Sequence, residues 1–242
     1  MRTPPSFTEI LCISEQGCSR PFLCRSEGGD LYWCKGVFAG LRSVRNEWVC
    51  ANLARQVSLP VPDFLIAKVE YALFDLWRRF KGPDVPSLVT QANPYVFASL
   101  RVPDVKDVMD RSDVRTMGSD LQAKIVAFDE FLRNLDRSEY NSNVLVTLGL
   151  ERKLYMIDHN LAFDDKFDRR DFLREHILRE SLPEVSEADK QGFRRKLQGA
   201  FTESFLERVW NEMPSEWVED DGAEAHKEQM LNAAKEVGDV RE

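Results

Sequence analysis

Apolar residues in the first hundred positions fall in short runs separated by turn residues, and this pattern predicts β-structure around one helix. The runs at 21–25 and 31–35 are rich in aromatic and aliphatic residues, with two adjacent glycines between them. Glycine readily takes the positive φ angles of tight turns, so these two runs predict a β-hairpin. Further strands are expected at 64–69 and 95–100.

One helix is predicted within this β-rich part. Apolar residues follow helical spacing from about Val44 to Val57, and Ser43 is placed to cap the first turn. The helix must end before Pro60, because a residue that precedes proline avoids the α conformation. The stretch 71–93 is interrupted by prolines and gives no clear element.

Helical patterns dominate the rest of the chain and suggest how it is divided. We predict a smaller lobe at 1–100, a second lobe at 101–218 and a polar helical tail at 219–242. Residues 95–100 are taken as the connection between the lobes. The elements expected after them are helices at 121–134, 171–180, 187–213 and 223–237, with short strands at 144–146 and 154–157.

Composition narrows the class of protein. The chain has 242 residues, 43% of them hydrophobic, which is ample for a core in one large domain or two lobes. A formal net charge of −8 argues against nucleic acid as a partner. We expect no membrane span and no signal peptide, because no apolar run is long enough. The five cysteines form no close CxxC pair, so reduced thiols in the cytoplasm are expected.

A polar loop after the helix at 121–134 carries the candidate chemistry. Asp136 and Asn141 lie five positions apart, and Asp158 follows directly after an apolar run. This order is typical of phosphoryl-transfer sites, in which an aspartate orients the attacking hydroxyl while an amide and a second carboxylate hold Mg²⁺. Each residue taken singly is better explained as part of a capped turn or as a strand-end carboxylate. Their combined spacing favours the functional interpretation.

Two motifs extend this pattern into a resemblance to a known family. The stretches 134–145 (Asn-Leu-Asp-Arg … Asn-Ser-Asn-Val-Leu) and 157–163 (Ile-Asp-His … Ala-Phe) resemble the HipA-like kinases. The pattern is also similar to that of phosphoinositide 3- and 4-kinases. The resemblance covers roughly residues 10 to 165. It implies an α+β, bilobal protein-kinase-like fold with a small β-rich N-lobe and a mainly helical C-lobe.

The resemblance also implies roles in the N-terminal half. Lys35 would contact the α- and β-phosphates of ATP, and Glu47 would hold it by an ion pair. Their alternatives are an edge-strand lysine and a solvated helix residue. The strand at 95–100 would meet adenine through its backbone. His159 is left open between an orienting role and that of a satisfied strand-end histidine.

Departures from the ordinary protein-kinase pattern point to the HipA-like variety. The phosphate-covering loop, expected near 16–21, has only Gly17, and Asn134 stands where protein kinases have histidine. The expected cofactors are ATP and Mg²⁺, and the expected acceptor is a serine or threonine of a protein. A small-molecule or lipid-headgroup kinase is one alternative. Another is a nucleotide-binding pseudokinase or interaction module, such as a toxin neutralised by an antitoxin-like partner, because the phosphate-covering loop is short. The chain is also short for a full HipA toxin, so the partner of that family is not carried over.

Overall fold

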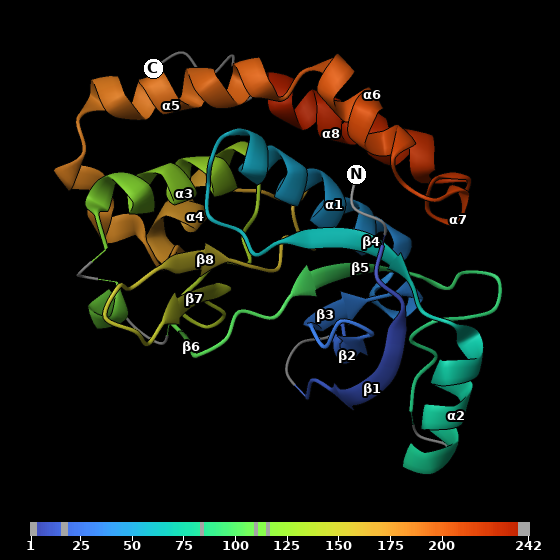
Figure 1. Ribbon diagram of the computed structural model, residues 1–242. Coiled ribbons are helices and arrows are strands. Elements are labelled where there is room, and N and C mark those ends of the chain that lie inside the picture. Colours follow the sequence, from blue (N-terminus) through green and yellow to red (C-terminus); the bar gives the residue numbers. More distant parts are fainter. Residues whose placement is uncertain (1–3, 16–18, 83–84, 109–110, 115–116, 237–242) are drawn as a thin grey trace.

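The N-terminal part of the computed structural model is a five-stranded antiparallel sheet with the strand order β1-β2-β3-β5-β4 (Figure 1). The structure describes residues 4–15, 19–82, 85–108, 111–114 and 117–236. The predicted hairpin joins the second and third strands, and Gly29 in its turn has a φ of 87°. The strands are β1 (Phe7–Ile13), β2 (Phe22–Ser26), β3 (Leu31–Lys35), β4 (Phe64–Lys68) and β5 (Tyr95–Leu100).

Two helices belong to this part of the chain. The first, α1 (Leu41–Gln56), follows the 3-10 turn η1 (Val37–Ala39), and Gly40 with a φ of 88° is its N-cap. The prediction of Ser43 as the cap is therefore wrong, because the glycine turns the chain three residues earlier and Ser43 lies inside the first turn.

The second helix, α2 (Tyr71–Lys81), was not predicted. It is short enough to end before the prolines begin at Pro83, and it buries Phe74. The prolines of the 71–93 stretch therefore concealed an amphipathic helix that precedes them.

The rest of the chain forms a small sheet of order β6-β7-β8 surrounded by helices. The predicted helix at 187–213 is two helices, because the Thr202 side chain accepts a hydrogen bond from the Phe205 N–H and starts a new one. The elements are β6 (Val105–Asp107), η2 (Arg111–Asp113), α3 (Ser119–Phe131), β7 (Val144–Thr147), β8 (Leu154–Met156), α4 (Arg169–Glu175), η3 (Arg179–Glu184), α5 (Glu187–Ala200), α6 (Glu203–Asn211), α7 (Ser215–Val218) and α8 (Ala223–Glu236).

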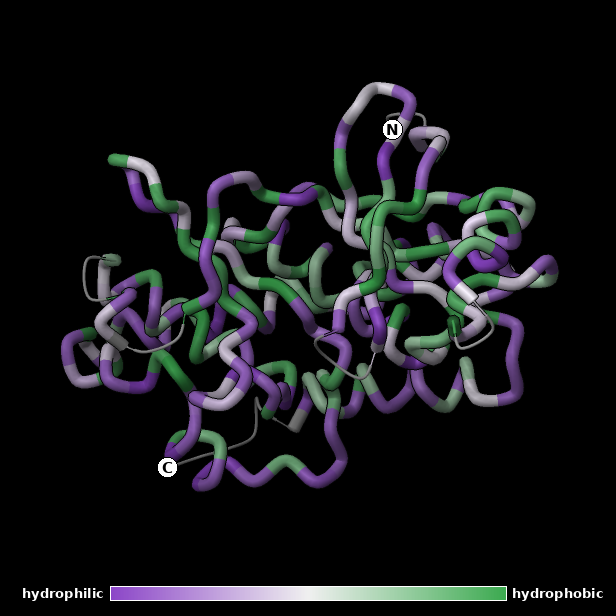
Figure 2. The backbone as a smooth tube through the Cα atoms, turned by 90° about the horizontal axis from the view of Figure 1, so that it is seen from below, coloured by the Kyte–Doolittle hydropathy of each residue, from purple (hydrophilic) through white to green (hydrophobic). Residues whose placement is uncertain are grey.

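The apolar packing divides into two cores. The smaller lies within the five-stranded sheet and α2, whereas the larger joins the C-terminal helices to the buried face of α1. Figure 1 shows α1 between the sheet and α6 and α8, and Figure 2 shows hydrophobic residues mostly in the interior and polar residues mostly at the periphery. The polar tail predicted at 219–242 includes α8, which buries Met230 in the larger core. Among the helices of the described residues, none is long and apolar enough to cross a membrane.

Candidate active site

Three charged side chains from distant parts of the chain meet at the end of β3. The Lys35 Nζ lies 2.5 Å from Glu47 Oε1 on α1 and 2.6 Å from Asp158 Oδ1, just beyond β8. The side chains of Lys35 and Glu47 are 10% and 2% exposed, whereas that of Asp158 is 25% exposed. The structure thus brings together the lysine, the glutamate and one of the predicted metal ligands.

The electrostatics of this group keep its charges fixed. Burial alone would lower the pKa of Lys35, but the charges of Asp158 and Glu47 more than offset it and raise that pKa above its ordinary value. Burial would likewise raise the pKa of Glu47, yet Lys35 and His159 hold it well below its usual range. Lys35 and Glu47 are therefore both ionised at neutral pH, which makes Lys35 a permanent cation that cannot serve as a proton acceptor.

The segment that carries Asp158 is held against α1. The Asn46 Nδ2 donates hydrogen bonds to the carbonyls of Asn160 and Ala162 at 2.8 and 2.9 Å, and the His159 N–H donates to Glu47 Oε2 at 3.0 Å. Asp158 itself has a φ of 55°, a conformation that a residue other than glycine keeps only when its surroundings impose it. Helix α1 thus positions both the glutamate and the backbone that follows the aspartate.

His159 serves this arrangement from within the core. It is 2% exposed, and its ring meets the Phe128 ring edge-on with 6.0 Å between centroids. Its Nδ1 lies 3.6 Å from Glu47 Oε2. Of its two predicted roles, these contacts favour that of orienting the Glu47 carboxylate.

Asp136 lies on the loop after α3, half-buried and bonded to asparagines. Its N–H donates to Asn134 Oδ1 at 3.2 Å, and its Oδ2 accepts a bond of 2.8 Å from Asn143 Nδ2. Burial, aided by the charge of Asp158, raises the pKa of Asp136, although hydrogen bonds from Asn141 and Asn143 work in the other direction. A raised pKa makes this carboxylate a stronger proton acceptor, as a general base requires.

The structure offers two asparagines as the metal-binding amide. Asn141 is exposed in the turn, and its N–H donates to the Ser138 hydroxyl at 3.3 Å. Asn143 immediately precedes β7, and its carbonyl accepts from the Ile157 N–H at 3.0 Å, so it lies across the β7–β8 pair beside Asp158. The spacing of five residues pointed to Asn141, whereas Asn143 is the asparagine that lies directly before an apolar strand.

A buried ion pair behind the loop was also missed. Arg137 is 1% exposed, and its Nε donates to Asp129 Oδ2 on α3 at 2.7 Å. Its Nη1 donates to the carbonyls of Asn143 and, at 3.3 Å, Ile157, while Asn134 Nδ2 donates to Asp129 Oδ1 at 3.0 Å. The pair therefore fixes the loop at both ends.

His176 also belongs to this cluster, and its contacts indicate which ring nitrogen carries the proton. Its Nδ1 accepts from the Leu178 N–H at 3.1 Å, so the proton is on Nε2, which lies 3.0 Å from Asp129 Oδ2. Burial lowers the pKa of His176, which keeps the ring neutral. Burial acts to raise the pKa of Asp129, but Arg137 and His176 outweigh it and hold that pKa below its usual range.

Gly36, next to Lys35, is a further residue that the sequence did not mark. A β-carbon at this position would lie 2.3 Å from the Leu88 carbonyl oxygen, a distance at which the backbone has to move. The position therefore requires glycine so that the segment after α2 can pass over the end of β3. The predicted phosphate-covering loop lies partly at 16–18, outside the described residues.

A family model and several solved structures are similar to this chain. The family model described as HipA-like kinase matches residues 7–238, nearly the whole chain. The chain belongs to the HipA-like kinase family. The resemblance inferred from its motifs is thereby confirmed, and no similar sequence is found among curated proteins.

Solved structures show the same fold for this HipA-like kinase. The Helicobacter pylori proinflammatory kinase CtkA is 13% identical with a TM-score of 0.58, over 96% of this chain and 92% of that one. The Golgi casein kinase is 11% identical with a TM-score of 0.56, over 98% and 73%. Its structure with Mn/ADP bound is 12% identical with a TM-score of 0.56, over 96% and 73%. At these identities the likeness establishes the kinase-like bilobal fold, as predicted.

Proposed function

We propose that this HipA-like kinase transfers the γ-phosphoryl group of ATP to a serine or threonine hydroxyl of a protein. The observation that carries the proposal is the convergence of Lys35, Glu47 and Asp158, because it joins a fixed cation to a carboxylate beside the loop of Asp136. Phosphoryl transfer depends mainly on positioning and on charge stabilisation.

Each residue has a defined part in this proposal. Lys35 would bind the α- and β-phosphates, and Glu47 would keep its ammonium group in place. Asp136 would orient the attacking hydroxyl and take its proton at the carboxylate. Asp158 and the amide oxygen of Asn143 supply the hard oxygen donors that Mg²⁺ prefers.

The donor set fits a nucleotide with a divalent ion. When bound, the ion would neutralise charge on the triphosphate. Asp158 is partly exposed and lies beside Lys35, so a carboxylate and a cation face the same space. The ADP and manganese bound to the Golgi casein kinase support this choice of ligands. Asn141 stays the alternative amide, because it also reaches Asp136.

The test is incubation of the purified protein with γ-labelled ATP, Mg²⁺ and a cell lysate, read on a gel and by chromatography. Asp136→Asn is expected to lower the rate by about 10²–10⁴-fold, since it removes the proton acceptor. Asp158→Asn should abolish the Mg²⁺-dependent rate, whereas the exposed Asp120→Asn on α3 should leave it unchanged.

The location of the label separates the alternatives. Label on serine or threonine of proteins supports the proposal, whereas label only on small molecules or lipids contradicts the acceptor class. Binding of ATP without any turnover would identify a pseudokinase. Full activity in the Asp158→Asn variant would refute the metal assignment.

A further inference from the structure

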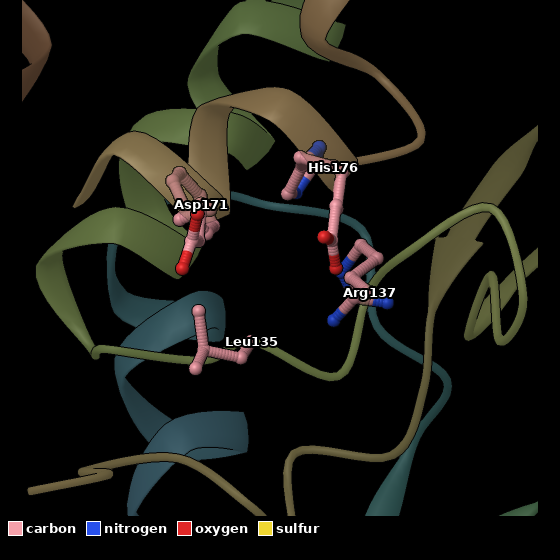
Figure 3. Close-up of a pocket in the computed structure, with 6 residues that line it drawn as sticks. Leu135, Arg137, Asp171 and His176 are labelled. Carbon is pink, nitrogen blue, oxygen red and sulfur yellow. The ribbon is translucent and has the colours of Figure 1, made fainter. Parts of the chain in front are cut away.

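A small cavity opens beside the loop of Asp136, between that loop and α4 (Figure 3). Its volume is about 200 Å³, below the roughly 300–1,000 Å³ of pockets that hold cofactors or drug-sized ligands. A single side chain is therefore the size of group that it suits. We call it the α4 cavity, and its lining residues are Leu135, Arg137, Asp171, Phe172, Glu175 and His176.

The loop side of the α4 cavity presents a hydrogen-bond donor that is not used within the described part of the chain. Arg137 is 1% exposed, and its Nε and Nη1 bond to Asp129 and to two carbonyls. Its Nη2 is buried and has no partner among the described residues. Such groups are rare because an unmade hydrogen bond is costly. Since Asp129 already balances the charge of Arg137, a neutral acceptor such as a peptide carbonyl is sufficient.

The opposite side of the cavity is acidic. Asp171 and Glu175 lie one turn apart on α4, with side chains 56% and 50% exposed. Arg174 lies 2.9 Å from one and 2.8 Å from the other and is itself 63% exposed, so two carboxylates share one cation. The rim therefore has a net negative charge, which attracts a cation and repels a phosphate or carboxylate.

Apolar surface connects these two sides. Leu135 lies on the loop (Figure 3), and Phe172, which is 3% exposed, lies on α4. The long methylene stems of lysine and arginine pack on such surface while their charged ends stay in water. A ligand with a carbonyl, an apolar stem and a cationic end matches the three parts of the cavity in order.

The α4 cavity is fixed relative to the catalytic aspartate. Leu135 and Arg137 are the two neighbours of Asp136 in the chain, and consecutive Cα atoms are about 3.8 Å apart. Ser138 and His176 form an isolated β-bridge that joins the loop to the end of α4. An extended peptide advances about 3.3 Å per residue, so the cavity lies within about three residues of a hydroxyl placed at Asp136.

We propose that the α4 cavity binds a lysine or arginine of the protein acceptor, within about three residues of the phosphorylated serine or threonine. The residue's backbone carbonyl accepts from Arg137 Nη2, its stem lies on Phe172, and its charge lies between Asp171 and Glu175. This inference rests on the proposed function, because it assigns the substrate class of the same site.

The experiment measures kcat/KM of the purified full chain for peptides with one serine and one varied residue. The varied residue is lysine, glutamine or glutamate, placed at each of the three positions before and after the serine. Wild-type protein is expected to prefer lysine over glutamine at one position by about two- to fivefold, in line with charge pairs between half-exposed side chains. The double variant Asp171→Lys/Glu175→Lys is expected to reverse the order and favour glutamate at that position.

The chain offers a matched control for this charge reversal. Glu224 and Glu228 are also exposed and one turn apart, but on α8, so Glu224→Lys/Glu228→Lys changes the net charge equally. It should keep the preference for lysine. If the lysine double variant does not fold, Asp171→Asn/Glu175→Gln is used and should abolish the preference.

The outcomes separate this inference from the proposed function. Phosphorylation of all the peptides at similar rates, or an unchanged preference in the α4 variants, overturns the subsite and leaves the kinase assignment intact. If the α8 control loses the preference for lysine to the same extent, the preference depends on net charge alone, and the subsite is also overturned. Absence of transfer to every peptide and to every protein of the lysate overturns the proposed function, and the subsite with it.

Discussion

The buried carboxylate of Asp129 holds the loop of Asp136 through Arg137, and its replacement by asparagine measures how much the fold depends on this contact. Both side chains are fully buried. Asparagine has nearly the same size, so the change removes a charge without leaving a cavity. Removing one partner of a buried ion pair typically costs about 3–5 kcal/mol, because the other charge stays buried.

The contacts of Asp129 indicate where within this range of about 3–5 kcal/mol the loss of stability should lie. Asp129 accepts from Arg137 Nε, Asn134 Nδ2 and His176 Nε2 at 2.7 to 3.0 Å. The single carbonyl of asparagine can keep part of this set, so we expect about 3 kcal/mol, at the lower end. Domains are stable by only about 5–15 kcal/mol in total. Asp129→Asn should therefore lose roughly a fifth to three fifths of the stability of a typical domain and still fold.

Urea unfolding followed by circular dichroism measures this loss. The matched control is Asp120→Asn on the same helix, because Asp120 is 62% exposed and its pair with Lys124 is on the surface. Pairs of this kind contribute at most about 1 kcal/mol. A loss at Asp129 no larger than that at Asp120 would refute the view that the buried pair supports the loop.

The pH dependence gives an independent check. The pKa of Asp129 in the fold lies below its ordinary value of about 3.9, so the unfolded chain binds a proton at this group more readily. Its contribution is fully present above about pH 4 and is lost as the pH falls toward the pKa in the fold. Asp129→Asn should therefore lose less stability than the wild type between pH 4 and pH 2. An identical acid limb in both proteins would contradict the depressed pKa.

Three further substitutions test other parts of the site. Glu47→Gln should lower kcat/KM for ATP by about 10²-fold, because the ammonium group that it positions is displaced; unchanged kinetics would remove it from the site. Asn143→Ala should weaken the Mg²⁺ dependence of the rate more than Asn141→Ala does, and the reverse order would restore the assignment based on spacing. Gly36→Ala should lower stability by about 1–3 kcal/mol in thermal unfolding, because the added β-carbon would meet the Leu88 carbonyl, and an unchanged midpoint would contradict that contact.

Local pattern pointed to Asp158, which follows a short apolar strand. The resemblance to HipA-like kinases pointed to Lys35, the last residue of β3, and to Glu47, whose pairing with Lys35 no helical pattern identifies. The kinase-like fold was predicted in the same way, by motifs whose order along the chain was informative.

Contacts between distant segments were beyond the reach of such patterns. Asp129 lies among apolar residues of α3. The sequence gives no sign that Arg137 and His176 both contact its carboxylate, and His176 is 47 residues from Asp129 along the chain. The spacing of five residues drew attention to Asn141 and away from Asn143, which lies two residues further on and donates to Asp136 at 2.8 Å. Helix α2 was not predicted because it is short and prolines follow it directly, so its apolar stripe is difficult to recognise in the sequence.

Helix α1, which carries the Glu47 partner of Lys35, is anchored to the larger lobe. On either side of Glu47, Arg45 donates to the Trp217 carbonyl at 2.6 Å, and Trp48 Nε1 donates to the Val209 carbonyl at 2.9 Å. The inner face of α1 also belongs to the larger core, where each buried aliphatic side chain contributes about 1.5–3 kcal/mol.

Swinging α1 outward would break these bonds and expose several such side chains at once. The cost would approach the whole stability of a domain. Helix α1 is therefore expected to move with the C-terminal helices as one unit, and Glu47 with it. If the acceptor is a protein, as proposed, differences in activity between acceptors are therefore expected from contacts near the loop of Asp136 and α4 and not from displacement of this helix.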